Sequence, residues 1–327
     1  MPERTGVEAA QVDDVEGHEP EMAGAAADGK GANAAAGGGG GNRCPRAGLI
    51  AGHAWLIQEP RAPGIARRQP EESMPLDLHV FRTLSDNAGA LLHDPASGAC
   101  AAVDVPDAGE VLAAARARGW TISDVFITHA HHDHTQGVAA VKQATGARVV
   151  GPEDARAAAP LDRVIGEGDT VSLGQETFDI WHTPGHSDGH LSYIGLGSKV
   201  ALVGDVVFVM GCGRVQPGQM DAMWTSLSRI MALPGDIRLV GGHDYTLANA
   251  RFARSVDPSN AALSARFAEA ETAKAEGRFW ALTTVAEEQA TNPFFRAGEG
   301  ALAAAVGRVG APAAQVFAAL REAKNKF

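Results

Sequence analysis

The strongest constraint on this chain is a run of metal-binding residue types directly after a short apolar segment. Val125-Phe126-Ile127 is typical of a buried strand, and the residues that follow it are Thr128-His129-Ala130-His131-His132-Asp133-His134. Alternate side chains of an extended segment point the same way, so His129 and His131 can bind one cation. Asp133 and His134 can face a second cation where the strand gives way to a turn. Imidazole and carboxylate suit zinc, iron or manganese, and two such ions can share a bridging hydroxide.

A solvated loop that happens to be rich in histidine is the alternative interpretation of this run. The run contains four of the chain's twelve histidines within six positions, and that concentration favours a metal site over a solvated loop.

Three further residues with metal-binding side chains each follow an apolar run: His186, Asp205 and His243. Singly, such a residue is more often a cap or a structural residue. The repeated placement favours function, because sites in layered α/β folds collect at the ends of strands. A carboxylate such as Asp205 can also bridge two cations. Three other histidines are left outside the predicted site: His132, His182 and His190.

Composition narrows the class of protein. The length of 327 residues fits one large domain, or one domain with an appendage. A net charge of -11 argues against a nucleic-acid-binding surface. Three widely spaced cysteines (Cys44, Cys100 and Cys212) give no disulfide framework and fit a reducing compartment. No apolar run approaches the roughly 18 residues that span a bilayer. We expect a soluble cytoplasmic protein, a monomer or small homo-oligomer, with neither nucleic acid nor membrane as a partner.

The chain divides into three parts by composition and by the pattern of apolar residues. Residues 1–73 are rich in Ala, Gly and acidic residues, and we expect a disordered N-terminal extension or sequence upstream of the true start. Residues 74–246 alternate short strands with helices, which predicts two mostly mixed sheets with outer helices. Residues 247–327 predict a helical domain. The expected strands are 78–83, 88–93, 99–104, 125–128, 148–150, 178–182, 191–194, 200–203 and 237–240. The expected helices are 107–118, 137–145, 153–159, 247–256, 260–276, 301–309 and 313–325.

Two other residue types could take part in chemistry. Cys212, flanked by glycines, would need a nearby base and a lowered pKa to act as a nucleophile; a small buried residue is the preferred interpretation. Arg214 and Arg296 could hold an anionic substrate, because guanidinium binds carboxylate through two hydrogen bonds. A solvated surface position is the alternative for either arginine.

Together these residues resemble the metallo-β-lactamase superfamily and, more narrowly, the type II glyoxalases, or hydroxyacylglutathione hydrolases. The wider resemblance rests on the H-x-H-x-D-H motif followed by His186, Asp205 and His243. The narrower one rests on the segments Ser85-Asp86-Asn87, Gly211-Cys212-Gly213-Arg214, Gly242-His243-Asp244-Tyr245-Thr246 and Thr291-Asn292-Pro293-Phe294-Phe295-Arg296. It runs from about Met74 to Arg296. The chain differs from the family pattern at Gln216, where a tyrosine is frequent, and at Ala88, where an aromatic residue is usual.

The resemblance implies an α/β fold, an αββα sandwich with a catalytic domain over 74–246 and a helical substrate-binding domain over 247–327. It implies two divalent metal ions per chain, with zinc expected and iron or manganese as alternatives. His129, His131 and His186 would hold one ion; Asp133, His134 and His243 would hold the other; Asp205 would bridge them. Asp133 and Asp205 would also be catalytic, orienting a metal-bound hydroxide as nucleophile. Arg214, Tyr245 and Arg296 would contact glutathione.

The activity that the resemblance implies is hydrolysis of a glutathione thioester, from S-2-hydroxyacylglutathione to a 2-hydroxy acid such as D-lactate, in methylglyoxal detoxification. The alternatives are a persulfide dioxygenase, or another thioester or ester hydrolase of the same fold. A nuclease of the superfamily would need a basic surface, which the acidic balance disfavours. A metal-holding module without turnover is the alternative outside enzymes.

Overall fold

Two six-stranded sheets face each other in residues 76–327, the residues that the computed structural model describes. The disorder predicted for residues 1–73 lies outside them. In the first sheet the spatial order follows the chain: β1 (Asp77–Thr83), β2 (Asn87–His93), β3 (Cys100–Val103), β4 (Asp124–Phe126), β5 (Arg148–Gly151) and β6 (Arg163–Val164). β1 to β3 form an antiparallel meander, and β3 to β6 are parallel. Parallel strands are buried on both faces, which explains the continuous apolar run at β4.

In the second sheet the spatial order of the strands is β14 (Leu282–Thr284), β13 (Arg238–Gly241), β10 (Val200–Gly204), β9 (Leu191–Gly195), β8 (Glu176–His182) and β7 (Thr170–Leu173). Its pairs are antiparallel except for β10 with β13. A short hairpin, β11 (Val207–Phe208) with β12 (Gly211–Cys212), stands beside it. Both sheets are therefore mixed, as predicted.

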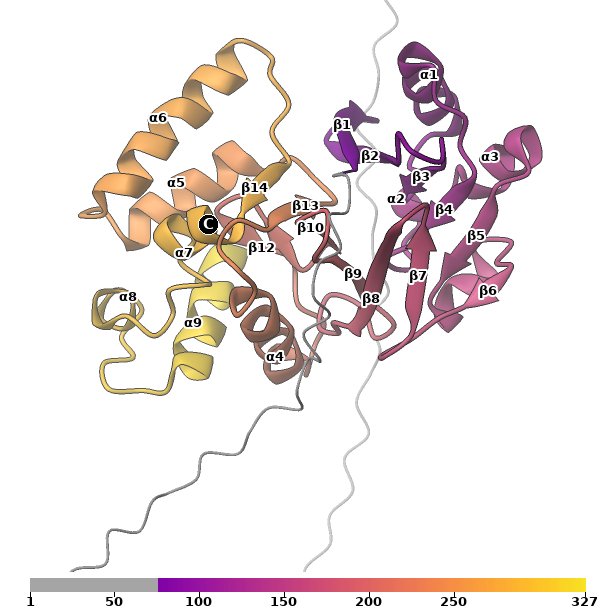
Figure 1. Cartoon of the computed structure of the whole chain (residues 1–327). Coiled ribbons are helices and arrows are strands. Elements are labelled where there is room, and N and C mark those ends of the chain that lie inside the picture. The colour runs from indigo at the N-terminus through magenta and orange to yellow at the C-terminus, as the bar shows by residue number, and fades with distance from the viewer. Residues whose placement is uncertain (1–75) are drawn as a thin grey trace, which may run out of the picture. The chain divides into compact units, whose positions relative to one another are not determined.

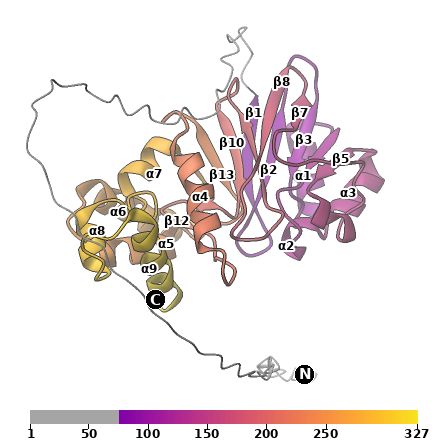
Figure 2. The same ribbon diagram turned by 90° about the horizontal axis from the view of Figure 1, so that it is seen from below.

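Helices cover the outer face of each sheet, as Figures 1 and 2 show. Phe126, Phe178 and Tyr193 are among the buried side chains of the apolar cluster that contains residues from both sheets. A second cluster lies between the first sheet and its helices, and a third joins the second sheet to α4 (Met220–Met231) and the C-terminal helices. The outer helices of the first sheet are α1 (Ala108–Arg118), α2 (His132–Thr135), α3 (Val138–Thr145) and the 3-10 helix η1 (Glu153–Ala157). The structure thus has the predicted αββα layers.

The C-terminal region is helical, again as predicted. Its helices are α5 (Thr246–Val256), α6 (Ala261–Ala275), α7 (Val285–Thr291), α8 (Gly300–Ala305) and α9 (Ala313–Asn325). Thr284 and Glu287 form the reciprocal capping box at the start of α7. β14 also comes from this region and pairs with β13. The C-terminal residues therefore complete the second sheet, and the division at residues 246 and 247 stays a prediction.

The main difference from the sequence analysis is α4 (Met220–Met231), for which no helix was predicted. Met223, Leu227 and Ile230 form its buried face at helical spacing. Its start carries no side-chain cap, so the usual sequence signal for a helix start is missing. Within residues 76–327, no helix is both long and apolar enough to cross a membrane.

Candidate metal centre

The loops that contain the predicted metal ligands leave their strands at one edge of the two sheets. The His129–His134 segment follows β4, and the loops after β8, β10 and β13 contain His186, Asp205 and His243. Hydrogen bonds tie these strand ends together, one across the sandwich and one within the second sheet. The Leu191 amide donates to Thr128 O at 2.8 Å, and the Gly242 amide donates to Gly204 O at 2.9 Å. Residues far apart in the sequence are thereby brought to one place.

Three imidazoles form the first group of ligand atoms. His131 Nδ1 lies 3.0 Å from His129 Nε2 and 3.0 Å from His186 Nε2. The other ring nitrogen of His186 donates to a carbonyl oxygen, Arg214 O, at 3.0 Å. A neutral imidazole has one N–H, so His186 Nε2 presents a lone pair to its neighbours. Converging lone pairs at this spacing suit a cation between them.

Asp133, His134 and His243 form the second group, with their ligand atoms within 4.8 Å of one another. Asp205 lies between the two groups. Its Oδ1 is 3.6 Å from His134 Nε2, and its Oδ2 is 3.3 Å from His186 Nε2 and 3.5 Å from His243 Nε2. One carboxylate thus faces both groups, which is the placement that a bridging ligand needs.

Each of four histidines is oriented by a hydrogen bond to its outward nitrogen. Asp104 Oδ2 accepts from His134 Nδ1 at 2.9 Å, and Asp86 Oδ1 accepts from His243 Nδ1 at 2.9 Å. The partner of His129 Nδ1 is Thr128 Oγ1 at 3.0 Å, and that of His186 is the Arg214 carbonyl. Such partners fix the tautomer and raise the basicity of the nitrogen that faces the metal.

The electrostatics of the two groups differ. Burial, reinforced by neighbouring histidines, holds the pKa of His129 well below its ordinary value, so that ring is neutral and free to coordinate. Burial also opposes the charged form of His134, but Asp205, Asp104 and Asp133 outweigh it and raise its pKa to about 9. The hydrogen bond from His243 lowers the pKa of Asp133, against the effect of burial. The carboxylates therefore favour positive charge at the second group, which a metal ion supplies as well as a proton does.

Two glycines leave room for this packing. A Cβ on Gly242 would stand 2.2 Å from Asp205 Oδ1, and one on Gly204, whose φ is +45°, would stand 2.6 Å from His190 Nε2. Any other residue at either position would displace a side chain at the site.

Two atoms provide a direct test of whether this site suits a metal. His134 Nε2 and Asp205 Oδ1 are buried and have no hydrogen-bond partner among residues 76–327. Unpaired buried polar atoms are rare unless an ion or water meets them. Asp104, His129 and His134 also lie close enough to form a third group, but the Asp104 oxygens already accept from Thr128 and His134. Asp104 is therefore a supporting residue, and the fold and the His/Asp cluster support a bound divalent metal.

The predicted substrate contacts are less uniform. Arg214 is exposed on the loop whose carbonyl holds His186. Tyr245 is 39% exposed, and its ring stacks on that of His243 with centroids 4.8 Å apart. Arg296 is different, because all three of its guanidinium nitrogens donate to carboxylates, those of Asp257 and Glu299. A contact between Arg296 and substrate stays a prediction; it would use the two N–H groups that these pairs leave over, or would require a pair to open.

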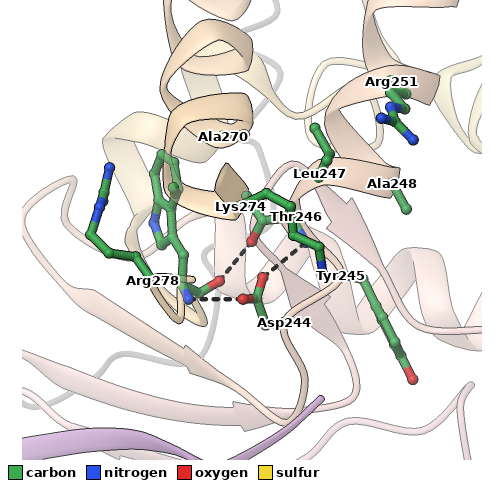
Figure 3. Close-up of a pocket in the computed structure, with 11 residues that line it drawn as sticks. Asp244, Tyr245, Thr246, Leu247, Ala248, Arg251, Ala270, Lys274 and Arg278 are labelled. Carbon is green, nitrogen blue, oxygen red and sulfur yellow. Dashed lines mark hydrogen bonds between the residues drawn. The ribbon is translucent and has the colours of Figure 1, made fainter. Parts of the chain in front are cut away.

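Tyr245 also borders a cavity of about 240 Å³ between α5 and α6, which Figure 3 shows. Arg251, Lys274 and Arg278 line this cavity, and the Tyr245 ring points away from them. The Asp244 carboxylate beside it accepts from the amides of Thr246 at 3.2 Å and Trp280 at 3.0 Å. This cavity contains none of the predicted metal ligands.

Some residues of the site were not found by the sequence analysis. Asp104 was placed in a strand and given no role. His190 was left out, yet its Nε2 accepts the Asp205 amide at 3.1 Å and so supports the backbone of the predicted bridging residue. Asp86 and Asn87 were noted only for their resemblance; Asn87 Nδ2 donates to Asp133 Oδ2 at 3.0 Å. His132 is exposed and His182 bonds the Asp188 carbonyl, and neither touches the cluster. For Asp104 and His190, only the topology identifies the role.

The fold and the site together define a metal-binding hydrolase fold of the metallo-β-lactamase superfamily, whose pattern matches residues 82–243. The solved structures agree. ETHE1 from Myxococcus xanthus superposes with a TM-score of 0.53 at 26% identity, covering 76% of this chain and 90% of that one. The BLEG-1 B3 metallo-beta-lactamase gives a TM-score of 0.52 at 21% identity over 67% of this chain and 99% of its own, a likeness of fold alone.

The rest of the chain narrows the class. Residues 244–327 match the pattern described as Hydroxyacylglutathione hydrolase C-terminus. The chain is 49% identical over 253 residues to the hydroxyacylglutathione hydrolase of Methylobacterium nodulans, covering 77% of this chain and 99% of that protein. It is 46% identical over 255 residues to that of Cereibacter sphaeroides, covering 78% and 100%. The chain belongs to the hydroxyacylglutathione hydrolase family. The predicted family and fold class are confirmed.

Proposed function

We propose that this protein hydrolyses the thioester of S-2-hydroxyacylglutathione, releasing glutathione and a 2-hydroxy acid such as D-lactate, and so acts in methylglyoxal detoxification. The observation that supports this most strongly is Asp205 between two groups of ligand atoms, in a chain that spans its hydrolase relatives end to end. The likeness to ETHE1 is lower in identity, so thioester hydrolysis is preferred to the alternatives.

The site would hold two divalent ions, and we propose zinc. His129, His131 and His186 would bind one, Asp133, His134 and His243 the other, and Asp205 both. Such a pair supplies a water-derived nucleophile near neutral pH and polarises the thioester carbonyl. Asp205 would set the spacing, since its carboxylate lies close to His186 of the first group and to His134 and His243 of the second. Asn87 holds the Asp133 carboxylate toward the site.

The remaining residues would position the substrate. Arg214 carries a fixed charge beside the His186 loop and suits a glutathione carboxylate. Burial, with nearby carboxylates adding, raises the pKa of Tyr245, so its hydroxyl remains a neutral hydrogen-bond donor. His131 is exposed and Asp133 partly so, which leaves an open side for substrate. Cytoplasmic location and a monomer or small homo-oligomer stay predictions, as does the absence of nucleic-acid and membrane partners.

Two thioesters that share one acyl group would test the proposal. D-lactate would be presented as the glutathione thioester and as the N-acetylcysteamine thioester, which lacks both glutathione carboxylates. Saturable hydrolysis of the first, with a lower kcat/KM for the second, is expected, and His131→Ala should abolish metal binding and turnover together. Equal kcat/KM for both substrates would contradict glutathione as the carrier, and no hydrolysis of either by metal-loaded protein would contradict the reaction itself.

A further inference from the structure

His190 is not one of the proposed metal ligands, yet its ring lies between two of them. The side chain is fully buried. The ring stacks on that of His129, with centroids 5.1 Å apart and the two planes inclined by 26°. On another side, Nε2 accepts the Asp205 amide at 3.1 Å. His190 therefore contacts a proposed ligand of the first group and the backbone of the proposed bridging residue.

The hydrogen bonds of His190 determine which of its nitrogens has the proton. A neutral imidazole has one N–H, and Nε2 accepts from an amide, so the proton is on Nδ1. Nδ1 then donates to Thr183 Oγ1 at 3.0 Å, and the Thr183 hydroxyl donates in turn to Ser192 Oγ at 2.9 Å. All three side chains are fully buried. This run of hydrogen bonds keeps the lone pair of Nε2 directed toward Asp205.

The backbone of His190 also closes the base of the loop that contains His186. Its carbonyl oxygen accepts the Thr183 amide at 2.9 Å, in addition to the side-chain hydrogen bond between the same two residues. β8 ends directly before Thr183, and β9 begins directly after His190. The loop over residues 183–190 is thereby anchored at both ends where it leaves the second sheet.

The backbone at Asp205 depends on this partner. Gly204, with a φ of +45°, and Asp205 are the central residues of a β-turn in which the Val206 amide donates to Val203 O at 3.0 Å. The Asp205 amide is instead bonded to the ring of His190. Without that acceptor a buried amide would lose its partner, which is costly. Reorientation of the peptide to find another partner would move the Asp205 side chain with it.

We propose that His190 is a positioning residue for the metal centre: its Nε2 holds the peptide that leads into Asp205 and so aims the bridging carboxylate, while its ring supports that of His129. The inference rests on the proposed function in that it takes Asp205 and His129 as metal ligands. Both nitrogens of His190 are used by protein partners, so His190 would not itself bind an ion. What the position requires is an acceptor at the place of Nε2.

The position of the ring proton is the first quantity to measure, by long-range ¹H–¹⁵N NMR of the histidine rings in the zinc-loaded protein. The signals of His190 are identified by their loss in His190→Gln. We expect a neutral ring with its proton on Nδ1. A proton on Nε2 would overturn the proposal, because that nitrogen could not then accept the Asp205 amide.

Two variants with side chains of equal length separate the hydrogen bond from the packing of the ring. His190→Gln keeps an acceptor, the amide oxygen, whereas the thioether of His190→Met is only a weak acceptor. Metal affinity is measured without substrate by competition with a chromophoric chelator, together with the visible spectrum of the Co²⁺-loaded protein. His190→Met should weaken metal binding by about 10- to 100-fold, as for other residues that orient ligands, and change the Co²⁺ spectrum. His190→Gln should keep most of the affinity.

A pair of threonine variants decides the question if His190→Met does not fold. Thr183→Val removes the acceptor of the Nδ1 proton and should weaken metal binding, though less than His190→Met. Thr83→Val makes the same change at another buried threonine, whose hydroxyl has no partner within residues 76–327, and should keep wild-type affinity.

Three results would overturn the positioning role: wild-type affinity in His190→Met, an equal loss in His190→Gln and His190→Met, or equal affinities in the two threonine variants. A wild-type protein that binds no divalent metal would instead overturn the proposed function. The two failures are therefore distinguishable.

Discussion

Asp104 provides a sharp test of how the second group of ligands is oriented. It is 4% exposed, and its carboxylate accepts three hydrogen bonds: from the Thr128 amide at 2.8 Å, from Thr128 Oγ1 at 2.8 Å and from His134 Nδ1 at 2.9 Å. Asp104→Asn preserves the shape but converts one oxygen into an NH₂ group. If the amide oxygen keeps the Thr128 amide, the NH₂ faces His134 Nδ1.

That exchange changes the tautomer of His134. With a donor opposite Nδ1, the ring proton moves to Nε2, the buried atom directed toward Asp205 and the other ligands. His134 Nε2 then presents a proton where a lone pair is needed. Losing such an orienting partner weakens metal binding by about 10- to 100-fold, or about 1.4 to 2.7 kcal/mol.

The assay is a chelator competition at fixed pH, with unfolding in urea measured in parallel. Asp94→Asn is the matched control, because Asp94 is 2% exposed and also accepts several hydrogen bonds, from Ala96, Ser97 and Gln175. It contacts none of the proposed ligands. We expect a loss of metal affinity in Asp104→Asn alone. Wild-type affinity in that variant, or an equal loss in both, would refute the orienting role.

Three further predictions follow from the same geometry. Arg214→Met should raise KM for the glutathione thioester while kcat changes little, because a contact made equally in ground and transition states acts on binding alone; steady-state kinetics in which only kcat falls would contradict it. Gly242→Ala should displace the Asp205 carboxylate and lower metal content, measured by elemental analysis; unchanged content would show that the close approach is relieved elsewhere. Burial, with a contribution from Arg321, lowers the pKa of Lys324 to about 8, below its unfolded value of about 10.4, so the charged form is disfavoured in the native state. This destabilisation is full below pH 8 and disappears as pH rises to about 10, so the unfolding free energy should rise over that interval. Lys324→Met should abolish the rise, and parallel profiles of unfolding free energy against pH for the two proteins would contradict the prediction.

The clustering of the proposed metal ligands could be predicted from sequence because its signal is local. His129, His131, Asp133 and His134 lie within one short segment, and the alternation of an extended chain indicates which of them would share a cation. His186, Asp205 and His243 each follow an apolar strand, so the edge of the sheets could be inferred without knowing how the strands pair.

The residues that orient those ligands could not be predicted in the same way. Asp104 follows β3, and it meets His134 only because β3 and β4 are parallel neighbours. Asp86 lies 157 positions from His243. Asp and Asn are also usual in turns, so Asp86 and Asn87 gave no separate signal. The substrate contact expected of Arg296 came from its residue type and stays a prediction; what the sequence did not indicate is that Asp257 and Glu299 pair with its guanidinium.

The most direct test of the central claim follows metal content and turnover in the same sample. Zinc would be withdrawn stepwise by a chelator, with zinc per chain and hydrolysis of S-D-lactoylglutathione measured at each step. We predict two zinc ions per chain in the active protein and loss of turnover as the average falls from two to one. Full turnover at one ion per chain would contradict the shared role of Asp205, and two bound ions without turnover would contradict thioester hydrolysis.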